Sequence, residues 1–132
     1  VTLWVSSSAR DTDFTAKLID LYPPSAAYPF GYALNLSDSI MRLRYRNSPE
    51  TSQFLPPGEI GQLTITLYPT SNLFSTGHRI RLDISSSNFP RFDVNPNTGE
   101  KIGLNRRQVS ADNSIHLDSE HPSHILLPII PS

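Results

Sequence analysis

The sequence predicts an all-β domain, an antiparallel β-sandwich or jelly roll made of about seven short strands. Three observations indicate this class. Short runs alternate between apolar and polar residues with a period of two, the chain contains 12 prolines, many of them in turn-like clusters, and no longer stretch shows helical periodicity. The 132 residues fit one domain, which we place at residues 1–132.

The alternating runs give the positions of the expected strands. They cover residues 1–6, 16–22, 41–46, 62–68, 79–84, 114–118 and 124–129. Side chains two residues apart share one face of a strand, so Ile80, Leu82 and Ile84 of the run 79–84 are expected to face the core. Turn residues between the runs, such as Pro56-Pro57-Gly58, favour short connections.

Three arginines, Arg42, Arg44 and Arg46, form the polar face of the expected strand 41–46. Three guanidinium groups in a row could bind a phosphate or a carboxylate ligand. Such a face is more often solvated, or it meets carboxylates on a neighbouring strand or another domain. The formal net charge of -1 provides no wider basic field, so we do not expect nucleic acid as a partner.

The composition excludes several further classes. The chain has no cysteine, which rules out disulfides, cysteine-ligated zinc and thiol catalysis but leaves the cellular compartment open. No apolar run approaches the roughly 18 residues that a membrane helix needs, so we expect no membrane partner. Nothing in the composition calls for a cofactor, and none is expected.

The segment 77–93 contains the residue types of a nucleophilic triad. His78 and Ser86 would nevertheless be roughly 26 Å apart along an extended strand, too far to form a pair. The G-x-S-x-G elbow that exposes a nucleophilic serine does not occur in the chain. We therefore interpret Ser85, Ser86 and Ser87 as hydroxyl residues that close a strand and bond nearby backbone groups, and we expect no catalytic residue here.

Two loops carry residue types that bind metal ions. The segment 93–104 begins with Asp-Val-Asn-Pro-Asn, which resembles the start of a calcium loop, but Pro96 interrupts the pattern. Turns held by Asn and Asp side chains are the simpler interpretation. A later loop contains His121 and His124, but Pro122 forbids the helix that would bring two histidines at this spacing onto one metal. We expect no metal site in either loop.

Two other loops are candidates for a binding surface. The segment 28–32 places three aromatic residues within five loop positions, where they cover the end of the sandwich or contact a partner. The connection 85–110 is rich in Asn, Pro and Arg, and loops of this length in a compact domain are usually functional or packed against something.

Four segments are distinctive in their exact residue sequence as well as in their alternation of apolar and polar residues. They are SSSARDTDFTAKLIDLYP (6–23), SDSIMRLRYRNS (37–48), LYPTSNLFSTGHRIRLDISSSNFPRFDVNPNTGE (67–100) and EHPSHILLPIIP (120–131). In register over essentially the whole chain, they resemble the C-terminal domain of the cocaine esterase / X-Pro dipeptidyl-peptidase family of serine hydrolases. The 67–100 block is the longest and the most specific of the four.

The resemblance implies a jelly-roll β-sandwich of the galactose-binding-like type, lacking its first strand, that forms part of a larger hydrolase. Members of the family carry an α/β-hydrolase domain with a Ser-Asp-His triad, often a helical cap, and then this sandwich. They cleave esters, amides or X-Pro peptides by acyl transfer. The triad belongs to the α/β-hydrolase domain, so the resemblance assigns no catalytic residue to this chain.

The resemblance also implies a partner. In such enzymes the sandwich packs against the catalytic domain and walls part of the substrate cleft, so the expected partner is the α/β-hydrolase domain of the same polypeptide, with a homo-oligomer left open. We place the contacts in the 28–32 segment and in the loop 87–108. The candidate contact residues are Tyr28, Phe30, Tyr32, Phe89, Arg91, Phe92, Asp93 and Asn95.

Two other classes of function stay open on the sequence alone. A stand-alone carbohydrate- or ligand-binding sandwich could use Trp4, Tyr28 and Tyr32 to stack on a sugar. A metal-dependent enzyme could use His121 and His124, although Pro122 between them disfavours such a site.

Overall fold

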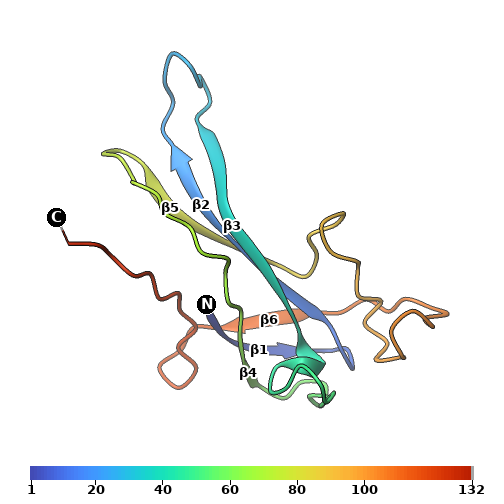
Figure 1. Ribbon diagram of the computed structural model, residues 1–132. Helices are drawn as coiled ribbons and strands as arrows, with labels where there is room; N and C mark the ends of the chain where they lie inside the picture. The colour runs from blue at the N-terminus through green and yellow to red at the C-terminus, as the bar shows by residue number, and fades with distance from the viewer. Residues whose placement is uncertain (132) are drawn as a thin grey trace.

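The structure, a computed structural model, describes residues 1–131 and consists of two three-stranded antiparallel sheets (Figure 1). The first sheet has the strand order β4-β1-β6, with β4 at Gly61–Thr64, β1 at Thr2–Ser7 and β6 at Asn113–His116. The second has the order β3-β2-β5, with β3 at Tyr32–Arg42, β2 at Asp13–Tyr22 and β5 at Arg79–Ser85. A short 3-10 helix, η1 at Leu43–Tyr45, follows β3. This architecture confirms the predicted all-β sandwich.

The hydrophobic core lies between the two sheets. On β1, Leu3 and Val5 face inward, and on β2, Phe14 and Ala16 meet them from the other sheet. The buried cluster consists of Leu3, Val5, Phe14, Ala16, Leu43, Leu55, Leu63 and Ile65. Burial of one large apolar side chain contributes about 1.5–3 kcal/mol, so these rows hold the two sheets together. Within residues 1–131, no helix is both long enough and apolar enough to cross a membrane.

β2, the central strand of the second sheet, is buried on both of its faces. Phe14 and Ala16 fill the inner face, whereas Asp13, Thr15 and Ile19 on the outer face are buried as well. Part of the outer cover comes from the long connection between β5 and β6, which we call the 86–110 loop after its residues. The loop packs directly on the sheet, because the side-chain amide of Asn95 donates to Asp13 at 2.8 Å.

The prediction of a strand over residues 41–46 was wrong. The chain pairs with β2 from Tyr32 to Arg42 and then turns into η1, so most of β3 was missed. A register shift opposite Leu18 and Ile19 breaks the side-chain alternation of β3. Polar residues such as Asp38, which is buried, also occupy positions where a sequence pattern would require apolar residues.

Two further strand predictions and one prediction of a core residue need correction. The segment 124–129 contributes only an isolated bridge between Thr2 and His124. The ladder of β4 ends at Thr64, although Ile65 stays in the core and its N–H donates to the carbonyl of Val1 at 2.8 Å. Ile80 is 54% exposed rather than buried, because it pairs with Asp20 near the far end of the second sheet.

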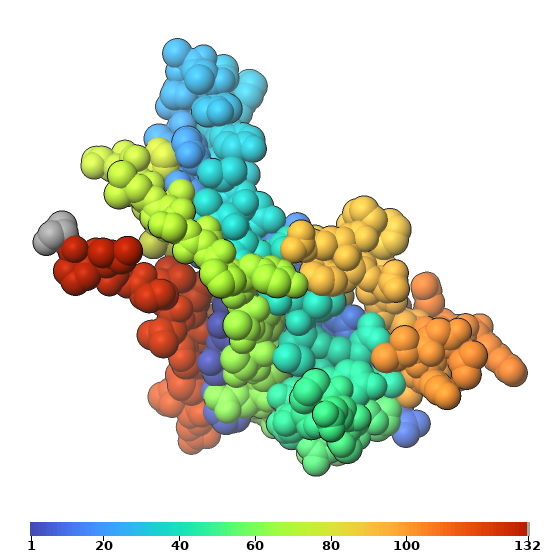
Figure 2. Space-filling model, viewed as in Figure 1, coloured from blue at the N-terminus to red at the C-terminus, as the bar shows by residue number. Residues whose placement is uncertain are grey.

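That far end is a hairpin that projects from the sandwich. Beyond the region where the two sheets face each other, β2 and β3 continue as a long antiparallel ribbon, seen at the top of Figures 1 and 2. After the register shift at Leu18 and Ile19, the β2–β3 pairing continues as far as Tyr22 and Tyr32, whereas β5 pairs with β2 only as far as Leu21. The segment 28–32 therefore lies at the tip of this hairpin, away from the core.

The position of the core between the two sheets predicts different effects on stability for substitutions at Phe14 and at Phe30. Phe14 is 2% exposed and Phe30 is 99% exposed. We expect Phe14→Ala to lower the free energy of unfolding of the chain by about 3–5 kcal/mol, because it removes a ring from a packed core. Phe30→Ala is expected to change it by less than about 0.5 kcal/mol. Urea unfolding of both variants measures the difference, and equal losses would contradict the assigned core.

Candidate interdomain contact surface

The tip of the β2–β3 hairpin has a defined turn geometry. The backbone N–H of Ser25 and that of Gly31 both donate to the carbonyl of Tyr28 at 2.9 Å, and the N–H of Tyr28 donates to the hydroxyl of Ser25 at 3.1 Å. Gly31 has a φ of 78°, and a Cβ at this position would lie 2.7 Å from the carbonyl oxygen of Tyr22. Only glycine fits there, so the sequence fixes the conformation of the tip.

An aromatic cluster supports the tip from below. The rings of Tyr28 and Tyr32 stack with centroids 5.0 Å apart, and Tyr22 lies edge-on to both at 6.0 Å. The ring of His78 lies 4.1 Å from that of Tyr22, and its Nδ1 is 2.8 Å from the buried carboxylate of Asp20. The cluster packs the base of the tip and leaves the side chain of Phe30 in solvent.

The second predicted contact segment, residues 87–108, lies within the 86–110 loop and is bound to the outer face of the β3-β2-β5 sheet. The side-chain amide of Asn88 donates to Asp38 at 3.1 Å, and Nε of Arg91 lies 2.9 Å from the other oxygen of the same carboxylate. Phe89, 69% exposed, lies between these two anchors in the sequence. Asp93 is exposed and Phe92 is half-buried, so this part of the loop has a mixed apolar and charged outer surface.

Asn95 differs from the other predicted contact residues because it is only 5% exposed. Its side-chain amide donates to Asp11 at 3.0 Å and to Asp13 at 2.8 Å, and its side-chain oxygen accepts from the N–H of Asn97 at 2.9 Å. The last bond is the side-chain turn expected for this segment. Asn95 therefore positions the loop from beneath rather than at the surface.

The arginines at positions 42 and 44 pair with the same two carboxylates, which overturns the prediction that they share one polar face of a strand. Arg42 binds Asp13 through Nε at 2.8 Å and Nη2 at 3.0 Å. Arg44, buried in η1, binds Asp11 through Nε at 2.7 Å. Because β3 ends at Arg42, the 3-10 turn rotates Arg44 into the interior, where it meets Asp11.

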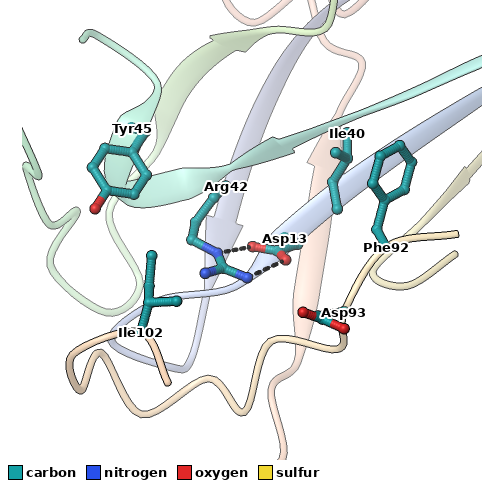
Figure 3. Close-up of a pocket in the computed structure, with 7 residues that line it drawn as sticks. All are labelled: Asp13, Ile40, Arg42, Tyr45, Phe92, Asp93 and Ile102. Carbon is teal, nitrogen blue, oxygen red and sulfur yellow. Dashed lines mark hydrogen bonds and ion pairs between the residues drawn. The ribbon is translucent and has the colours of Figure 1, made fainter. Parts of the chain in front are cut away.

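The hydrogen bonds from Arg42 to Asp13 also affect its ionisation. They raise the pKa of the Arg42 guanidinium above its ordinary value, against a smaller opposing effect of burial. Arg42 therefore stays charged beside Asp13. Figure 3 shows this pair at the base of a hollow that Ile40, Phe92 and Asp93 also line.

The two predicted contact segments form separate surfaces. The hairpin tip lies at the top of Figure 1, and the 86–110 loop lies at the right side of the sandwich. Tyr28, Phe30 and Tyr32 are brought together with Tyr22 and His78 at the first surface. Phe89, Arg91, Phe92, Asp93 and Asn95 are brought together over the sheet at the second. A partner that contacts both would have to span the hairpin and the sandwich.

The aromatic residues considered for sugar binding do not form one platform. Trp4 lies on β1 in the other sheet, with its ring edge-on to His121 at 5.3 Å. Tyr28 and Tyr32 at the hairpin tip stack on each other, which covers one face of each ring. Trp4 thus lies apart from the two tyrosines.

The candidate triad does not assemble. His78 binds Asp20, and Ser85 lies at the other end of β5, where its hydroxyl accepts from the N–H of Ser87 at 3.4 Å. A different serine lies beside a histidine: the hydroxyl of Ser6 is 3.0 Å from Nε2 of His116, across neighbouring strands of the first sheet. Ser6 belongs to a regular strand rather than an elbow, so this contact is a cross-strand hydrogen bond.

The histidine loop is held by its own hydrogen bonds. Nδ1 of His121 is 3.0 Å from Asp118, and Nδ1 of His124 is 2.7 Å from the carbonyl oxygen of Pro122. In the part of the chain that the structure describes, no three His, Asp or Glu side chains come together in a way that could hold a metal ion.

Sequence reasoning missed the acidic residues Asp11, Asp13 and Asp20, all buried. A signal was present for two of them: Asp11 and Asp13 have the same two-residue spacing as Arg42 and Arg44. Equal spacing in two antiparallel segments lets Asp13 meet Arg42 and Asp11 meet Arg44, although Asp11 precedes β2 and Arg44 lies in η1. Nothing in the sequence indicated the pairing of Asp20 with His78.

Comparison with known proteins gives a match to one family over nearly the whole chain. The profile of the X-Pro dipeptidyl-peptidase C-terminal non-catalytic domain matches residues 1–126. Cocaine esterase from Rhodococcus sp. (strain MB1 Bresler) is 48% identical over 130 residues, which are 97% of this chain and 22% of that protein. A putative serine esterase from Mycobacterium bovis is 29% identical over 147 residues, or 98% of this chain and 21% of that protein.

Solved structures give the same result. An aminopeptidase from the marine sediment archaeon Thaumarchaeota archaeon superposes with a TM-score of 0.85 at 32% identity, over 92% of this chain and 21% of that one. An alpha-amino acid ester hydrolase superposes with a TM-score of 0.78 at 35% identity, over 91% of this chain and 20% of that one.

The fold and the matches define the class first: this is a β-sandwich that forms a non-catalytic part of larger hydrolases. The chain belongs to the family of X-Pro dipeptidyl-peptidase C-terminal non-catalytic domains. It spans about a fifth of the length of the curated relatives it matches, which are larger proteins. The resemblance that the sequence segments carried is confirmed.

The position of Asn95 leads to a second prediction. We expect Asn95→Ala to lower the free energy of unfolding by about 1–3 kcal/mol, because Asp11 and Asp13 each lose a buried hydrogen bond. Backbone amides of residues 88–98 should exchange hydrogen faster, since the loop loses its anchor. The exposed Asn105→Ala serves as the control and should leave both quantities unchanged. Unchanged exchange in Asn95→Ala would show that the loop is held by other contacts.

Proposed function

We propose that this chain is the accessory sandwich of a serine hydrolase acting on esters or X-Pro amides, and that it packs against the α/β-hydrolase catalytic domain of the same polypeptide. In that role it contributes no catalytic residue and helps to shape the substrate cleft. The names of its relatives support the reaction class, since they include a cocaine esterase, an aminopeptidase and an alpha-amino acid ester hydrolase. Each of them is several times longer than this chain.

The observation that carries the proposal is the position of Phe30. Its side chain is 99% exposed at the tip of a projecting hairpin whose conformation Gly31 and the tyrosine cluster fix. Leaving a phenylalanine in water forgoes about 1.5–3 kcal/mol of burial. An exposed aromatic side chain on a defined turn is typical of an anchor that fills a pocket in a partner.

Other exposed apolar side chains extend the surface available to a partner. Phe89 lies beside charged Arg91 and Asp93 in the 86–110 loop, which gives the apolar centre and polar rim of a typical interface. Exposed apolar residues also lie outside the two predicted segments: Leu73, Leu126, Ile129 and Ile130. Together with Phe30 and Phe89 they give a large partner domain several apolar side chains to cover.

The third prediction tests the anchor in the full-length polypeptide that carries this chain. Phe30→Asp places a charge where an apolar pocket is expected, so kcat/KM for p-nitrophenyl esters and X-Pro anilides should fall by a factor of about 10 or more, which corresponds to about 1.4 kcal/mol. Phe30→Leu keeps an apolar side chain and should retain activity within about two-fold.

A matched measurement separates docking from misfolding. Because Phe30 is exposed, Phe30→Asp should leave the urea midpoint of the isolated chain unchanged. Full activity of the Phe30→Asp enzyme would remove the hairpin tip from the interface.

The fourth prediction concerns the isolated chain, which should show no turnover of either substrate. Ser86→Ala and Ser6→Ala test the two places where a serine could act, the end of β5 and the pair with His116. Turnover by the chain that disappears in one of these variants would show that the domain has its own active site and would contradict the proposed role.

A further inference from the structure

Two adjoining hollows lie between η1 and the 86–110 loop, and they share Tyr45 and Ile102 as walls. The first, of about 320 Å³, is walled by Ile40 and Phe92 and has Asp93 at its edge (Figure 3). The second, of about 420 Å³, is lined by Phe54, Arg44 and Lys101. We call the two together the Tyr45–Ile102 groove. Ile102 is 55% exposed, so an apolar side chain stands uncovered at its middle.

The charges inside the groove are already neutralised. In the first hollow Arg42 makes a two-pronged pair with Asp13, and in the second Arg44 binds Asp11 at 2.7 Å and the carbonyl oxygen of Glu100 at 3.0 Å. These pairs also fix the floor, since Asp11 and Asp13 are buried. A ligand therefore meets a rigid base without a strong net charge.

The charges that remain lie at the two ends. Asp93 lines the first hollow and Lys101 lines the second, and within residues 1–131 neither of them forms a salt bridge. The groove thus has a negative end, an apolar middle and a positive end. A phosphate-rich ligand would meet the Asp93 carboxylate, and a purely apolar ligand would leave both end charges without a partner.

We propose that the Tyr45–Ile102 groove binds an extended segment of the rest of the same polypeptide, with an apolar side chain in the middle, a basic residue toward Asp93 and an acidic residue toward Lys101. This inference rests on the proposed function, because it takes the occupant from the larger hydrolase. The relatives provide the room for such a segment, since this chain accounts for 22% of the cocaine esterase. Complementary charge at both ends fixes the direction of the segment as well as its identity.

A carbodiimide, which joins a carboxylate directly to a lysine amine in contact with it, tests the proposal on the full-length polypeptide. Mass spectrometry should find Lys101 joined to an Asp or Glu, and Asp93 joined to a Lys, both outside this domain and close together in sequence. Ile102→Asp should reduce both crosslinks at least five-fold because it charges the middle of the groove. Leu104→Asp, a change of an exposed residue in the same loop outside the groove, should reduce neither.

Two further measurements distinguish the proposed segment from a second copy of the chain in the groove. A mixture of normal and ¹⁵N-labelled protein reveals crosslinks between two copies, and a Lys101 crosslink found only between copies would overturn the proposal in favour of a dimer contact. Lys101→Arg cannot form the crosslink but keeps the positive charge. In the full-length polypeptide with this change, the backbone amides of residues 99–103 should therefore stay protected from hydrogen exchange. Absence of the crosslinks together with free exchange at 99–103 would overturn it outright.

The crosslinking test of the groove can fail or succeed independently of the hydrolysis test of the proposed function. If Phe30→Asp lowers hydrolysis and the crosslinks are absent, the groove inference fails alone. If the crosslinks form and the full-length polypeptide hydrolyses neither substrate, the proposed reaction fails and the groove assignment stands.

Discussion

Two buried carboxylates, Asp11 and Asp13, hold the end of β3, the adjoining η1 and the distant 86–110 loop together. Arg44 reaches Asp11 from η1, Arg42 reaches Asp13 from the end of β3, and Asn95 bonds both from the 86–110 loop. A buried carboxylate without partners is strongly destabilising, about 3–5 kcal/mol when one member of a buried pair is removed. The strand ends, the 3-10 turn and the long loop therefore have to adopt these positions together.

The outward surface follows from that constraint. Because the 86–110 loop is tied down over β2, it covers the outer face of the second sheet and presents Phe89 and Asp93 to solvent. The loop and η1 also become the two walls of the Tyr45–Ile102 groove, with the ion pairs as its floor. The hairpin tip has no such cover and relies on its own tyrosines, which leaves Phe30 free. The same fold thus creates an exposed aromatic side chain at the hairpin tip and a groove with charged ends, both suited to a partner domain.

The sequence predicted the parts of the fold that depend on local pattern. Alternation located β1, β4 and β5, because each of these strands has one face on the core or close to it. It failed for β3, where a register shift and buried polar residues remove the pattern, and for Arg44, whose role depends on Asp11, 33 residues away. Asn95 was identified as a contact residue, but its bonds reach back 84 and 82 residues to Asp11 and Asp13. Contacts at that separation have no local signature, whereas the family resemblance, carried by whole segments, was enough to assign the non-catalytic role.

A double-mutant cycle between Asp13→Ala and Asn95→Ala tests most directly whether the carboxylates and the loop form one unit. Asp13 is suited to this because Arg42 is partly exposed and can reach water when its partner is removed. Urea unfolding of the wild type, both single variants and the double variant gives the coupling energy, and the cycle of Asp13→Ala with Asn105→Ala serves as the control. Direct bonding at 2.8 Å predicts a coupling of about 1 kcal/mol or more for the Asn95 cycle and additivity for the control. Additivity within about 0.5 kcal/mol in both cycles would contradict the account, because the loop would then be held independently of the carboxylates.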